Sequence, residues 1–579
     1  MGSHTDIRWE AWGEEAFREA KETGKPILLD LSAVWCHWCH VMDETSYADD
    51  EIIGLINEDF VPIRVDIDRR PDIRERYNLG GYPTTAFLNG DGEIISGGTY
   101  IPPDQMKRAL VQIKSHFQKT GGTVDHAHRR PPEVEVAAPQ GGLSDEIYEE
   151  VLGQLLQQYD EIYGGFGGAP KFPQPDALDL ALYHYQASGN DFFRKMVERT
   201  LEGMAGGGMY DPVEGGFYRY SVTRDWTEPH YEKMLDVNVG LLRNYLHAYT
   251  VLGKEAYRDV ARDVLRYLEA NLRDPKEGFW GSQDADEEYY PLPLEERQKR
   301  EAPYIDRTVY ADLSGQAIEI YLLASAVLGE ERHRDAALAA LARLEEQLMT
   351  KEGALSHYWD GSPHVDALLS DYLSVARAFL AAFEHTGERR YLDRSEALVQ
   401  EMMAVLTDEG GVLRDRRTQE GDIGLLREGQ KPLMDNAHAA LLLMKLMELT
   451  RKEEYGTAAA QILEGFGSQY RRYAISASGY ALALEAHRKG VLKVDVVLDP
   501  RTEGRDEILA PFLRAFRPDW VLRPLEVGTD LFQAANYPED PVPAIYACKG
   551  TSCSPPITSP TPLEEVEAFA ADLEASVSP

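Results

Sequence analysis

The chain contains 579 residues, of which 43% are hydrophobic and 27% are charged, as in ordinary globular proteins. This length exceeds the size at which one hydrophobic core keeps growing, so we expect two to four domains. The formal net charge of −38 disfavours nucleic acid and anionic membranes as partners, because both would repel the chain.

Membrane-spanning segments, signal peptides and disulfide scaffolds each have a sequence signature that can be checked. No uninterrupted apolar run is long enough to cross a membrane, and the polar start of the chain lacks the apolar core of a signal peptide. Only four cysteines are present, far too few for a disulfide scaffold. These features favour a soluble, cytoplasmic protein, and we expect no bound cofactor and no metal.

Helix and strand signals alternate along residues 1–119, which we expect to form the first domain. Apolar runs flanked by turn residues predict strands, and amphipathic periodicity predicts helices. The expected order is a helix at 9–21, a strand at 26–31, a helix at 39–58, a strand at 60–66, a hairpin at 84–95 and a helix at 103–119. This order suits a mixed α/β sheet covered by helices.

The junction between the first strand and the next helix carries Cys36-His37-Trp38-Cys39. A helix N-terminus stabilises a thiolate, and the CxxC spacing lets a second thiol resolve a mixed disulfide. The segment from Ile27 to Cys36 resembles thioredoxin. By that resemblance Asp30 is the buried acid that moves protons for the cysteines, and Pro83, within Gly81-Tyr82-Pro83-Thr84, is a cis-proline that faces the pair.

Two other uses of the cysteine motif stay open. His40 follows the motif, so two thiolates and an imidazole are available to a metal, although no fourth ligand is evident. The pair could also be structural or vestigial. If it is redox-active, we expect Cys36 to be partly exposed at the helix N-terminus and the more reactive thiol, with Cys39 one turn inside and shielded.

Glycine and proline concentrate in residues 120–142, which we interpret as a linker. Residues 143–489 are helical and repetitive. An aromatic residue or a histidine follows each of five turns by four positions, and an acidic residue lies near the start of the apolar helix before each turn. The turns lie at Gly189, Gly253, Gly329, Gly387 and Arg451.

Repeated helical hairpins bury their apolar faces only against neighbouring copies. The five hairpins, with one helix near 144–160 and one near 469–488, supply twelve helices. Twelve alternating helices can close into an all-α (α/α)6 toroid whose first and last helices pair. An open solenoid is the alternative, but the long aromatic-rich loops favour the closed form because they would converge on one pocket.

Residues 490–579 return to alternating strand and helix signals, and we interpret them as a small α/β C-terminal domain. The signals are strands at 491–498 and 544–547 and a helix at 562–575. This domain carries Cys548 and Cys553, which can pair only if residues 549–552 turn back, because an extended strand would separate them by about 16 Å. We expect a second redox-active pair, and two ordinary buried thiols are the alternative.

Short motifs along nearly the whole chain carry a wider resemblance. They are Cys36 to Met42, Arg70 to Ile73, Gly97 to Pro102, Gly164 to Gly167 with Ala169 to Pro173, His230 to Leu235, and Cys548 with Cys553. These motifs resemble the YyaL and spermatogenesis-associated thioredoxin-like family. The resemblance implies a thioredoxin-like domain, an (α/α)6 domain similar to N-acylglucosamine 2-epimerases and six-hairpin glycosidases, and a small C-terminal domain.

Polar and aromatic residues gather in the loops at one end of the expected toroid. One loop supplies Arg219, Asp225, Trp226, Glu228, His230, Glu232 and Lys233, and other segments supply Asp284, Asp286, His357, Trp359, Asp371, Asp435 and His438. Stacking aromatics, carboxylates and a histidine base are what a carbohydrate site requires. We expect His230, Glu232 and Lys233 to be catalytic, and Arg219, Trp226, Asp284, Asp286, His357, Trp359, Asp435 and His438 to bind substrate.

A structural role is the alternative for these toroid residues. An aspartate near a helix start usually caps the helix, and this interpretation suits the five repeated residues Asp176, Asp236, Asp312, Asp371 and Asp435. Three ionisable groups within His230 to Lys233 are harder to explain by capping alone.

Three functional hypotheses follow. The first is a thiol–disulfide oxidoreductase with Cys36, Cys39, Asp30 and Pro83 at its site and a ligand-binding toroid; its partners would be thioredoxin-reductase-type or client thiol proteins. The second is a carbohydrate-active isomerase, epimerase or hydrolase that acts on a sugar-like molecule in the toroid, with a regulatory or inert thioredoxin-like domain. The third is a non-catalytic binding protein. In each case we expect residues 143–488 to fold without the N-terminal domain.

Overall fold

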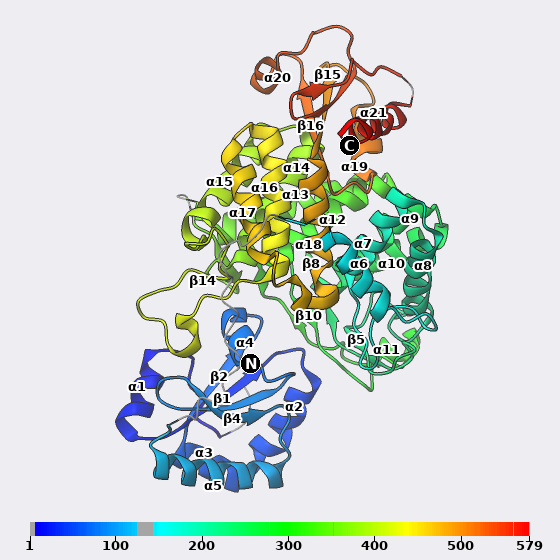
Figure 1. Cartoon of the computed structure of the whole chain (residues 1–579). Helices are drawn as coiled ribbons and strands as arrows, with labels where there is room; N and C mark the ends of the chain where they lie inside the picture. The colour runs from blue at the N-terminus through cyan, green and yellow to red at the C-terminus, as the bar shows by residue number, and fades with distance from the viewer. Residues whose placement is uncertain are drawn as a thin grey trace. The chain divides into compact units, whose positions relative to one another are not determined.

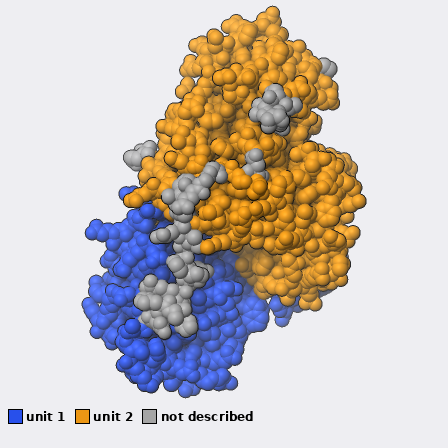
Figure 2. Space-filling model, in the orientation of Figure 1, with its two compact units in different colours: residues 1–135, 282–306, 414–430 blue, residues 136–281, 307–413, 431–579 orange. Residues whose placement is uncertain are grey.

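A computed structural model of the chain describes residues 6–123, 143–144, 146–276, 278–350, 353–559 and 561–577. Most of the predicted linker at 120–142 therefore lies outside the described residues. The chain divides into two compact units (Figure 2). The first comprises residues 1–135, 282–306 and 414–430, and the second comprises residues 136–281, 307–413 and 431–579.

A four-stranded mixed sheet forms the centre of the first unit. Its order is β2-β1-β3-β4, with β1 parallel to β2 and antiparallel to β3, and β3 antiparallel to β4. The strands are β1 Ile27–Ser32, β2 Val61–Asp66, β3 Thr84–Leu88 and β4 Ile94–Gly98. Because β1 lies between two other strands, its aliphatic run is buried almost throughout.

Helices cover this sheet (Figure 1). They are α1 Glu14–Thr23, α2 His37–Glu44, α3 Asp50–Asp59, α4 Pro71–Tyr77 and α5 Pro103–Thr120. The helix predicted at 39–58 is two helices, because Asp49 accepts hydrogen bonds from the backbone N–H groups of Glu51 and Ile52 and so begins a new helix. The unit has the predicted thioredoxin-like fold, and the Tyr82–Pro83 peptide bond is cis, as predicted.

Two segments from far along the chain complete the first unit, residues 282–306 and 414–430. They contain β10 Ser282–Gln283, α11 Leu294–Arg297, β11 Ile305–Asp306 and the 3-10 turn Gly424–Arg427. Arg76 of α4 is 2% exposed and donates hydrogen bonds to the Leu425 carbonyl oxygen and to the Asp415 carboxylate. The sequence-based division assigned both segments to the toroid, but this buried arginine holds the second one against α4.

Two layers of helices form most of the second unit. The inner helices are α7 Pro175–Ser188, α9 Leu235–Leu252, α12 Ala311–Leu328, α14 Leu369–Thr386, α16 Leu433–Thr450 and α18 Ser478–Lys489. The outer helices are α6 Glu146–Gln158, α8 Asp191–Gly206, α10 Glu255–Asn271, α13 Glu331–Leu348, α15 Arg389–Leu406 and α17 Glu453–Phe466. Each inner helix contacts the next, and α18 contacts both α7 and α6, which closes the ring. The closed (α/α)6 toroid is confirmed.

Short turns join each inner helix to the next outer helix. The predicted turn residues Gly189, Gly253, Gly329, Gly387 and Arg451 all have left-handed backbone and end an inner helix. Glycine adopts this conformation without steric cost, which explains why it occupies four of these five turns. The inner helix α12 is long and apolar enough to cross a membrane, yet 56% of it is buried in the structure, as expected of a core helix.

Longer connections precede the inner helices at the opposite end. They contain β5 Tyr220–Ser221, β6 Pro229–His230, β7 Lys233–Met234, β8 Arg273–Asp274, β9 Gly278–Phe279, β12 Val309–Tyr310, β13 Ser356–Trp359 and β14 Pro363–Asp366. These connections carry most of the toroid residues that the sequence nominated as a site.

A second four-stranded sheet forms the C-terminal module, residues 490–577. Its order is β16-β15-β17-β18, with β15 parallel to β16 and antiparallel to β17, and β17 antiparallel to β18. Its elements are β15 Leu492–Leu498, α19 Arg505–Arg514, β16 Trp520–Glu526, α20 Asp530–Ala535, β17 Ala544–Lys549, β18 Ser552–Cys553 and α21 Pro562–Val577. The module contacts the toroid through β16 and α19, which pack on α14 and α12.

Candidate functional site

Cys36 and Cys39 form a disulfide at the start of α2. Cys36 is the N-cap residue, and its Sγ accepts a hydrogen bond from the Cys39 N–H at 3.2 Å. A helix N-terminus that directs an N–H at sulfur stabilises a thiolate. The predicted position of Cys36 is therefore confirmed, and in the oxidised state seen here both sulfurs are held by each other rather than available to a metal.

The predicted exposure of Cys36 is wrong, because both cysteines are 3% exposed. Trp35 beside the pair is 2% exposed and packs edge-on against Tyr82, with ring centroids 6.3 Å apart. The exposed residue of the motif is Trp38, at 44%.

Asp30 lies in the middle of β1 and is 1% exposed. Its carboxylate is 2.7 Å from the Arg64 Nε and accepts a hydrogen bond from the Tyr47 hydroxyl at 3.3 Å. Burial raises the pKa of Asp30 to about 6, although the charge of Arg64 opposes this. The structure therefore contains the expected buried acid, already engaged in an ion pair.

Two further carboxylates lie at the end of β2, and the sequence analysis missed them. The Trp35 indole N–H donates to Asp68 at 2.5 Å, which places Asp68 beside the cysteine loop. Burial raises the pKa of Asp68 to about 7, with a further contribution from Asp66, and burial together with Asp306 raises the pKa of Asp66 to about 6. Because these groups titrate near neutral pH, they can accept or release protons there.

Residues 282–306 approach the histidines of the cysteine motif within the first unit. His40 Nδ1 lies 3.6 Å from an Asp284 carboxylate oxygen, and burial lowers the pKa of His40. Asp286 accepts hydrogen bonds from the backbone N–H groups of Glu288 and Tyr289. Asp284 and Asp286 were predicted to bind substrate in the toroid, but both belong to the first unit, together with the thioredoxin-like fold.

Lys233 was predicted to be catalytic, but its side chain is fully buried in a structural ion pair. Its Nζ lies 2.6 Å from the Asp211 carboxylate and donates to a glycine carbonyl at 2.8 Å. Lys171 makes the same two bonds in the preceding loop, with Asp160 at 2.7 Å and a glycine carbonyl at 2.8 Å. The repetition assigns Lys233 to anchoring a glycine–aromatic loop.

The other predicted residues in the connection before α9 differ in burial and in partners. Trp226 is 1% exposed, and its indole N–H donates to the Tyr163 carbonyl oxygen, so it cannot stack on a ligand. His230 Nδ1 lies 2.5 Å from Glu232, and its ring stacks on Tyr220 with centroids 4.8 Å apart. Of the three predicted catalytic residues in the toroid, only the pair His230 and Glu232 keeps an arrangement suited to proton transfer.

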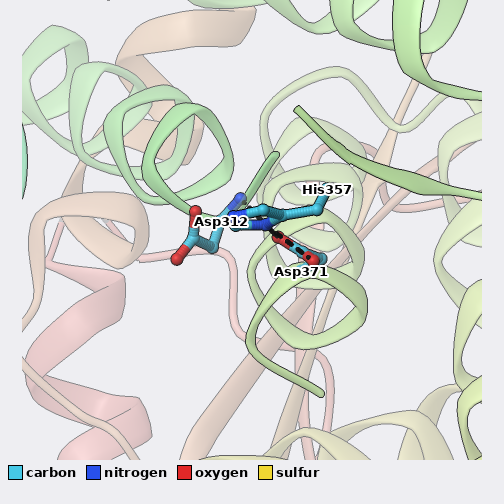
Figure 3. Close-up of side chains that lie close together, drawn as sticks. All are labelled: Asp312, His357 and Asp371. Carbon is cyan, nitrogen blue, oxygen red and sulfur yellow. Dashed lines mark hydrogen bonds and ion pairs between the residues drawn. The ribbon is translucent and has the colours of Figure 1, made fainter. Parts of the chain in front are cut away.

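Asp312, His357 and Asp371 meet at the starts of α12 and α14 (Figure 3). Their potential ligand atoms all lie within 4.8 Å of one another. The Asp371 carboxylate, however, accepts hydrogen bonds from the backbone N–H groups of Asp312 and Leu368 and from His357, which lies 2.9 Å away. This cluster joins two connections of the toroid, consistent with the structural alternative for the repeated aspartates.

A cavity of 240 Å³ lies among the inner helices of the toroid. Its charged lining residues include Asp176, Asp179, Arg243, Glu319, Arg377, Glu384, His438 and Lys445. The C-terminal module contributes Phe512, Phe516 and Trp520 to the lining. Among the predicted toroid residues, His438 lines this cavity, whereas Arg219, Trp359 and Asp435 are not among its lining residues.

The charges of the cavity are arranged in pairs. Arg243 lies 2.7 Å from Asp176 and 2.9 Å from Asp179, and Glu319 lies 2.9 Å from Arg377. Although burial alone would raise it, the pKa of Asp176 is held well below its usual range by His438 and Arg243. The sequence signal for this cavity is a charged residue on the otherwise apolar face of an inner helix. Of the charged lining residues, Asp176 was interpreted from the sequence as a helix cap and His438 was predicted to bind substrate, and the others were not considered.

Cys548 and Cys553 form a second disulfide, with Cα atoms 4.1 Å apart. Residues 549–552 turn back between β17 and β18, as the pairing required, and Gly550 has φ of 57° at the turn. Cys548 is 2% exposed, whereas Cys553 is exposed. The alternative of two separate buried thiols is therefore not what the structure shows.

Comparisons with known proteins agree with this architecture. The family model described as Thioredox_DsbH, protein of unknown function DUF255, matches residues 1–131. Spermatogenesis-associated protein 20 of Homo sapiens is 25% identical over 97% of this chain and 90% of its own length. The uncharacterized protein B0495.5 of Caenorhabditis elegans is 25% identical over 97% of this chain and 95% of its own length.

Solved structures similar to the chain include a sugar epimerase from a ruminal bacterium. It is 14% identical, with a TM-score of 0.46, and the match covers 56% of this chain and 87% of the epimerase. The ring of contacts among the inner helices establishes the toroid without this likeness.

Proposed function

We propose that this chain is a thiol–disulfide oxidoreductase. It is related along nearly its whole length to spermatogenesis-associated protein 20, and it carries a thioredoxin-like domain with a CxxC pair. The observation that carries the proposal is the position of Cys36. Its sulfur caps α2 and receives the Cys39 N–H, which favours the thiolate that attacks a disulfide.

The reaction of the reduced pair follows from this geometry. The Cys36 thiolate attacks one sulfur of a client disulfide, a mixed disulfide forms, and the other client sulfur leaves as a thiolate. Cys39 then attacks Cys36 Sγ, which releases the second client thiolate and forms the Cys36–Cys39 disulfide seen here. Two electrons pass to the client, and a dithiol reductant regenerates the pair.

Protons for these steps are available beside the cysteines. Asp68, whose pKa burial raises to about 7, is hydrogen-bonded to Trp35 next to Cys36. It can take the proton of the Cys39 thiol as Cys39 becomes a nucleophile. Asp30, paired with Arg64, is the second candidate for this role.

The proposal implies partners and a compartment. A dithiol reductant of the thioredoxin-reductase type and client thiol proteins would be the partners. A reducing cytoplasm would keep the pair cycling, and the small number of cysteines in an acidic chain supports that location.

The test is catalysis of insulin reduction by the full chain with dithiothreitol as reductant. The wild-type chain should accelerate turbidity, Cys36→Ser should abolish the acceleration, and Cys548→Ser should retain most of it. Equal rates for the wild-type and Cys36→Ser chains would contradict an oxidoreductase based on this pair.

The cavity of the toroid supports a second candidate function, the binding of a small polar molecule such as a sugar. Its lining combines paired charges on inner helices with aromatic side chains of the C-terminal module, a composition typical of small-molecule sites. Catalysis at His230 and Glu232 stays a prediction.

A thermal-shift screen of monosaccharides and sugar acids against the full chain tests this second function. A ligand in the cavity should raise the melting temperature of the wild-type chain and raise it less in His438→Ala, since His438 lines the cavity. His364→Ala, at an exposed position, is the matched control. A shift that His438→Ala and His364→Ala lose equally would place the ligand elsewhere.

A further inference from the structure

The C-terminal module repeats the sheet of the thioredoxin-like domain. In each sheet the first strand in the chain, β1 or β15, is parallel to the second and antiparallel to the third, and the third is antiparallel to the fourth. Helices follow the first, second and fourth strands in both. A proline directly precedes the third strand in both, Pro83 before β3 and Pro543 before β17.

The repetition extends to a buried ionic group. The fourth residue of the central strand is aspartate in both sheets, Asp30 and Asp495. Opposite each lies an arginine of the parallel neighbour, Arg64 or Arg523, and each arginine forms an ion pair with that aspartate.

A tyrosine hydroxyl completes each group. Tyr47 donates to Asp30 at 3.3 Å, and Tyr537 donates to Asp495 at 2.7 Å. Tyr47 precedes α3, whereas Tyr537 follows α20, so the hydroxyl reaches the same carboxylate from different parts of the two folds. The shared topology and ionic group identify the C-terminal module as a second thioredoxin-like fold.

The cysteine pair occupies a different place in the second fold. The loop that follows β15, residues 499–504, contains no cysteine, whereas the corresponding loop after β1 leads to Cys36. The pair of the second fold lies across β17 and β18 instead, at Cys548 and Cys553. One sulfur is buried and the other belongs to an exposed residue on the edge strand.

We propose that the Cys548–Cys553 disulfide is a second thiol-exchange site, independent of the CxxC pair, that reacts with an external thiolate. Cys553 is the accessible electrophile because it is exposed, whereas Cys548 is 2% exposed. Attack at Cys553 Sγ therefore makes Cys548 the leaving group. The Tyr537 hydroxyl lies 3.4 Å from Cys548 Sγ. Its one proton, which Asp495 accepts at 2.7 Å in the oxidised state, would turn from that carboxylate to the departing thiolate.

The electron balance is that of ordinary exchange. A bond forms between the external sulfur and Cys553 Sγ, the Cys548–Cys553 bond breaks, and Cys548 leaves with the electron pair. A second thiolate, from the same dithiol or from another monothiol, then attacks the external sulfur and releases Cys553. The external thiols become a disulfide, and the protein pair gains two electrons.

The experiment uses the full chain with Cys36→Ser and Cys39→Ser, so that only the C-terminal pair can react. Reduced glutathione and reduced thioredoxin serve as separate probes, and acid-quenched alkylation with peptide mapping locates each product. We expect reduction while circular dichroism still reports the native fold, with the glutathione adduct on Cys553. Reaction with glutathione alone identifies a small thiol as the reductant, and reaction with thioredoxin alone identifies a protein dithiol.

A matched pair of variants tests the role of the leaving group. Tyr537→Phe removes the hydroxyl beside Cys548 and should slow reduction about tenfold, the effect of one lost hydrogen bond to a charged group. The ring of Tyr546 stacks on the ring of Tyr537, with centroids 4.1 Å apart. Tyr546→Phe removes a hydroxyl from this second ring and should leave the rate unchanged. The proposal is overturned if neither probe reduces the native chain, if the adduct maps to Cys548, or if both variants react at the wild-type rate.

Discussion

At the residue scale, the carboxylates beside the CxxC pair link its chemistry to pH. Burial raises the pKa of Asp68 to about 7 and the pKa of Asp30 to about 6. An unfolded chain would ionise both near pH 4. The contribution of these two groups to the free energy of unfolding is therefore fully present below about pH 4 and is lost as pH rises through about 6 to 7.

We predict that Asp68→Asn raises the melting temperature of the chain at pH 8 more than at pH 5. At pH 8 the native carboxylate must be ionised in a buried site, and the amide removes this cost while its oxygen still accepts from Trp35. Asp91→Asn, at an exposed position, removes the same charge and is the control. Equal shifts at both pH values would contradict the raised pKa of Asp68.

Lys233 provides the second residue-scale prediction. Lys233→Met leaves the buried Asp211 charge without its cation, so it should destabilise the second unit by about 3–5 kcal/mol in urea unfolding. Lys195→Met, at an exposed ion pair with Asp191, should cost about 0–1 kcal/mol. A Lys233→Met chain of wild-type stability would restore the catalytic interpretation of this lysine.

The sequence predicted those site residues whose chemistry depends on local spacing. Cys36, Cys39 and Pro83 lie in short segments with a recognised geometry, and the structure places them as expected in the fold. The ion pair of Lys233 was not predicted, because its partner, Asp211, is 22 residues away and no periodicity connects the two. The same limit applies to Asp68, whose raised pKa depends on tertiary burial rather than on its neighbours in the chain.

At the element scale, the toroid helices were predictable and the long connections were not. Turn glycines and apolar faces repeat along the chain and determine the ring of helices. The connection at residues 414–430 has no such repeat. Its place in the thioredoxin-like unit rests on contacts with α4 from residues more than 300 positions away in the chain. The buried guanidinium of Arg76 makes several of them, and the Tyr77 hydroxyl, which accepts from the Leu425 N–H, makes another.

We predict that Arg76→Ala releases residues 414–430 from α4. Hydrogen exchange of the full chain should become faster in that segment, because the variant loses the bonds to Asp415 and to the Leu425 carbonyl oxygen. Arg18→Ala, on the exposed face of α1, is the control and should leave exchange unchanged. Unchanged exchange in Arg76→Ala would show that other contacts hold the segment.

At the scale of the whole molecule, the C-terminal module packs against the inner helices of the toroid. The Leu522 N–H donates to Glu384 of α14 at 2.9 Å, and Phe516 packs on His247 of α9 with ring centroids 4.2 Å apart. The sequence analysis separated the two domains at residue 489 because the signals change there. A change of secondary structure type does not exclude a shared core.

We predict that a fragment of residues 143–579 melts cooperatively and that a fragment of residues 143–489 melts at a lower temperature. The shorter fragment loses the contacts of Leu522 and Phe516 and exposes the lining of the cavity. Differential scanning calorimetry of both fragments is the measurement. Equal melting temperatures would show that the toroid does not depend on the module.

The central claim, that Cys36 and Cys39 form the working redox pair, is tested most directly by a redox titration. The full chain with Cys548→Ser and Cys553→Ser is equilibrated in graded dithiothreitol and glutathione redox buffers, and alkylation followed by mass measurement counts the free thiols. We predict a reversible two-electron transition between about −270 and −120 mV, the range of thioredoxin-like catalysts. A pair that stays oxidised throughout that range while the chain remains folded would contradict the claim.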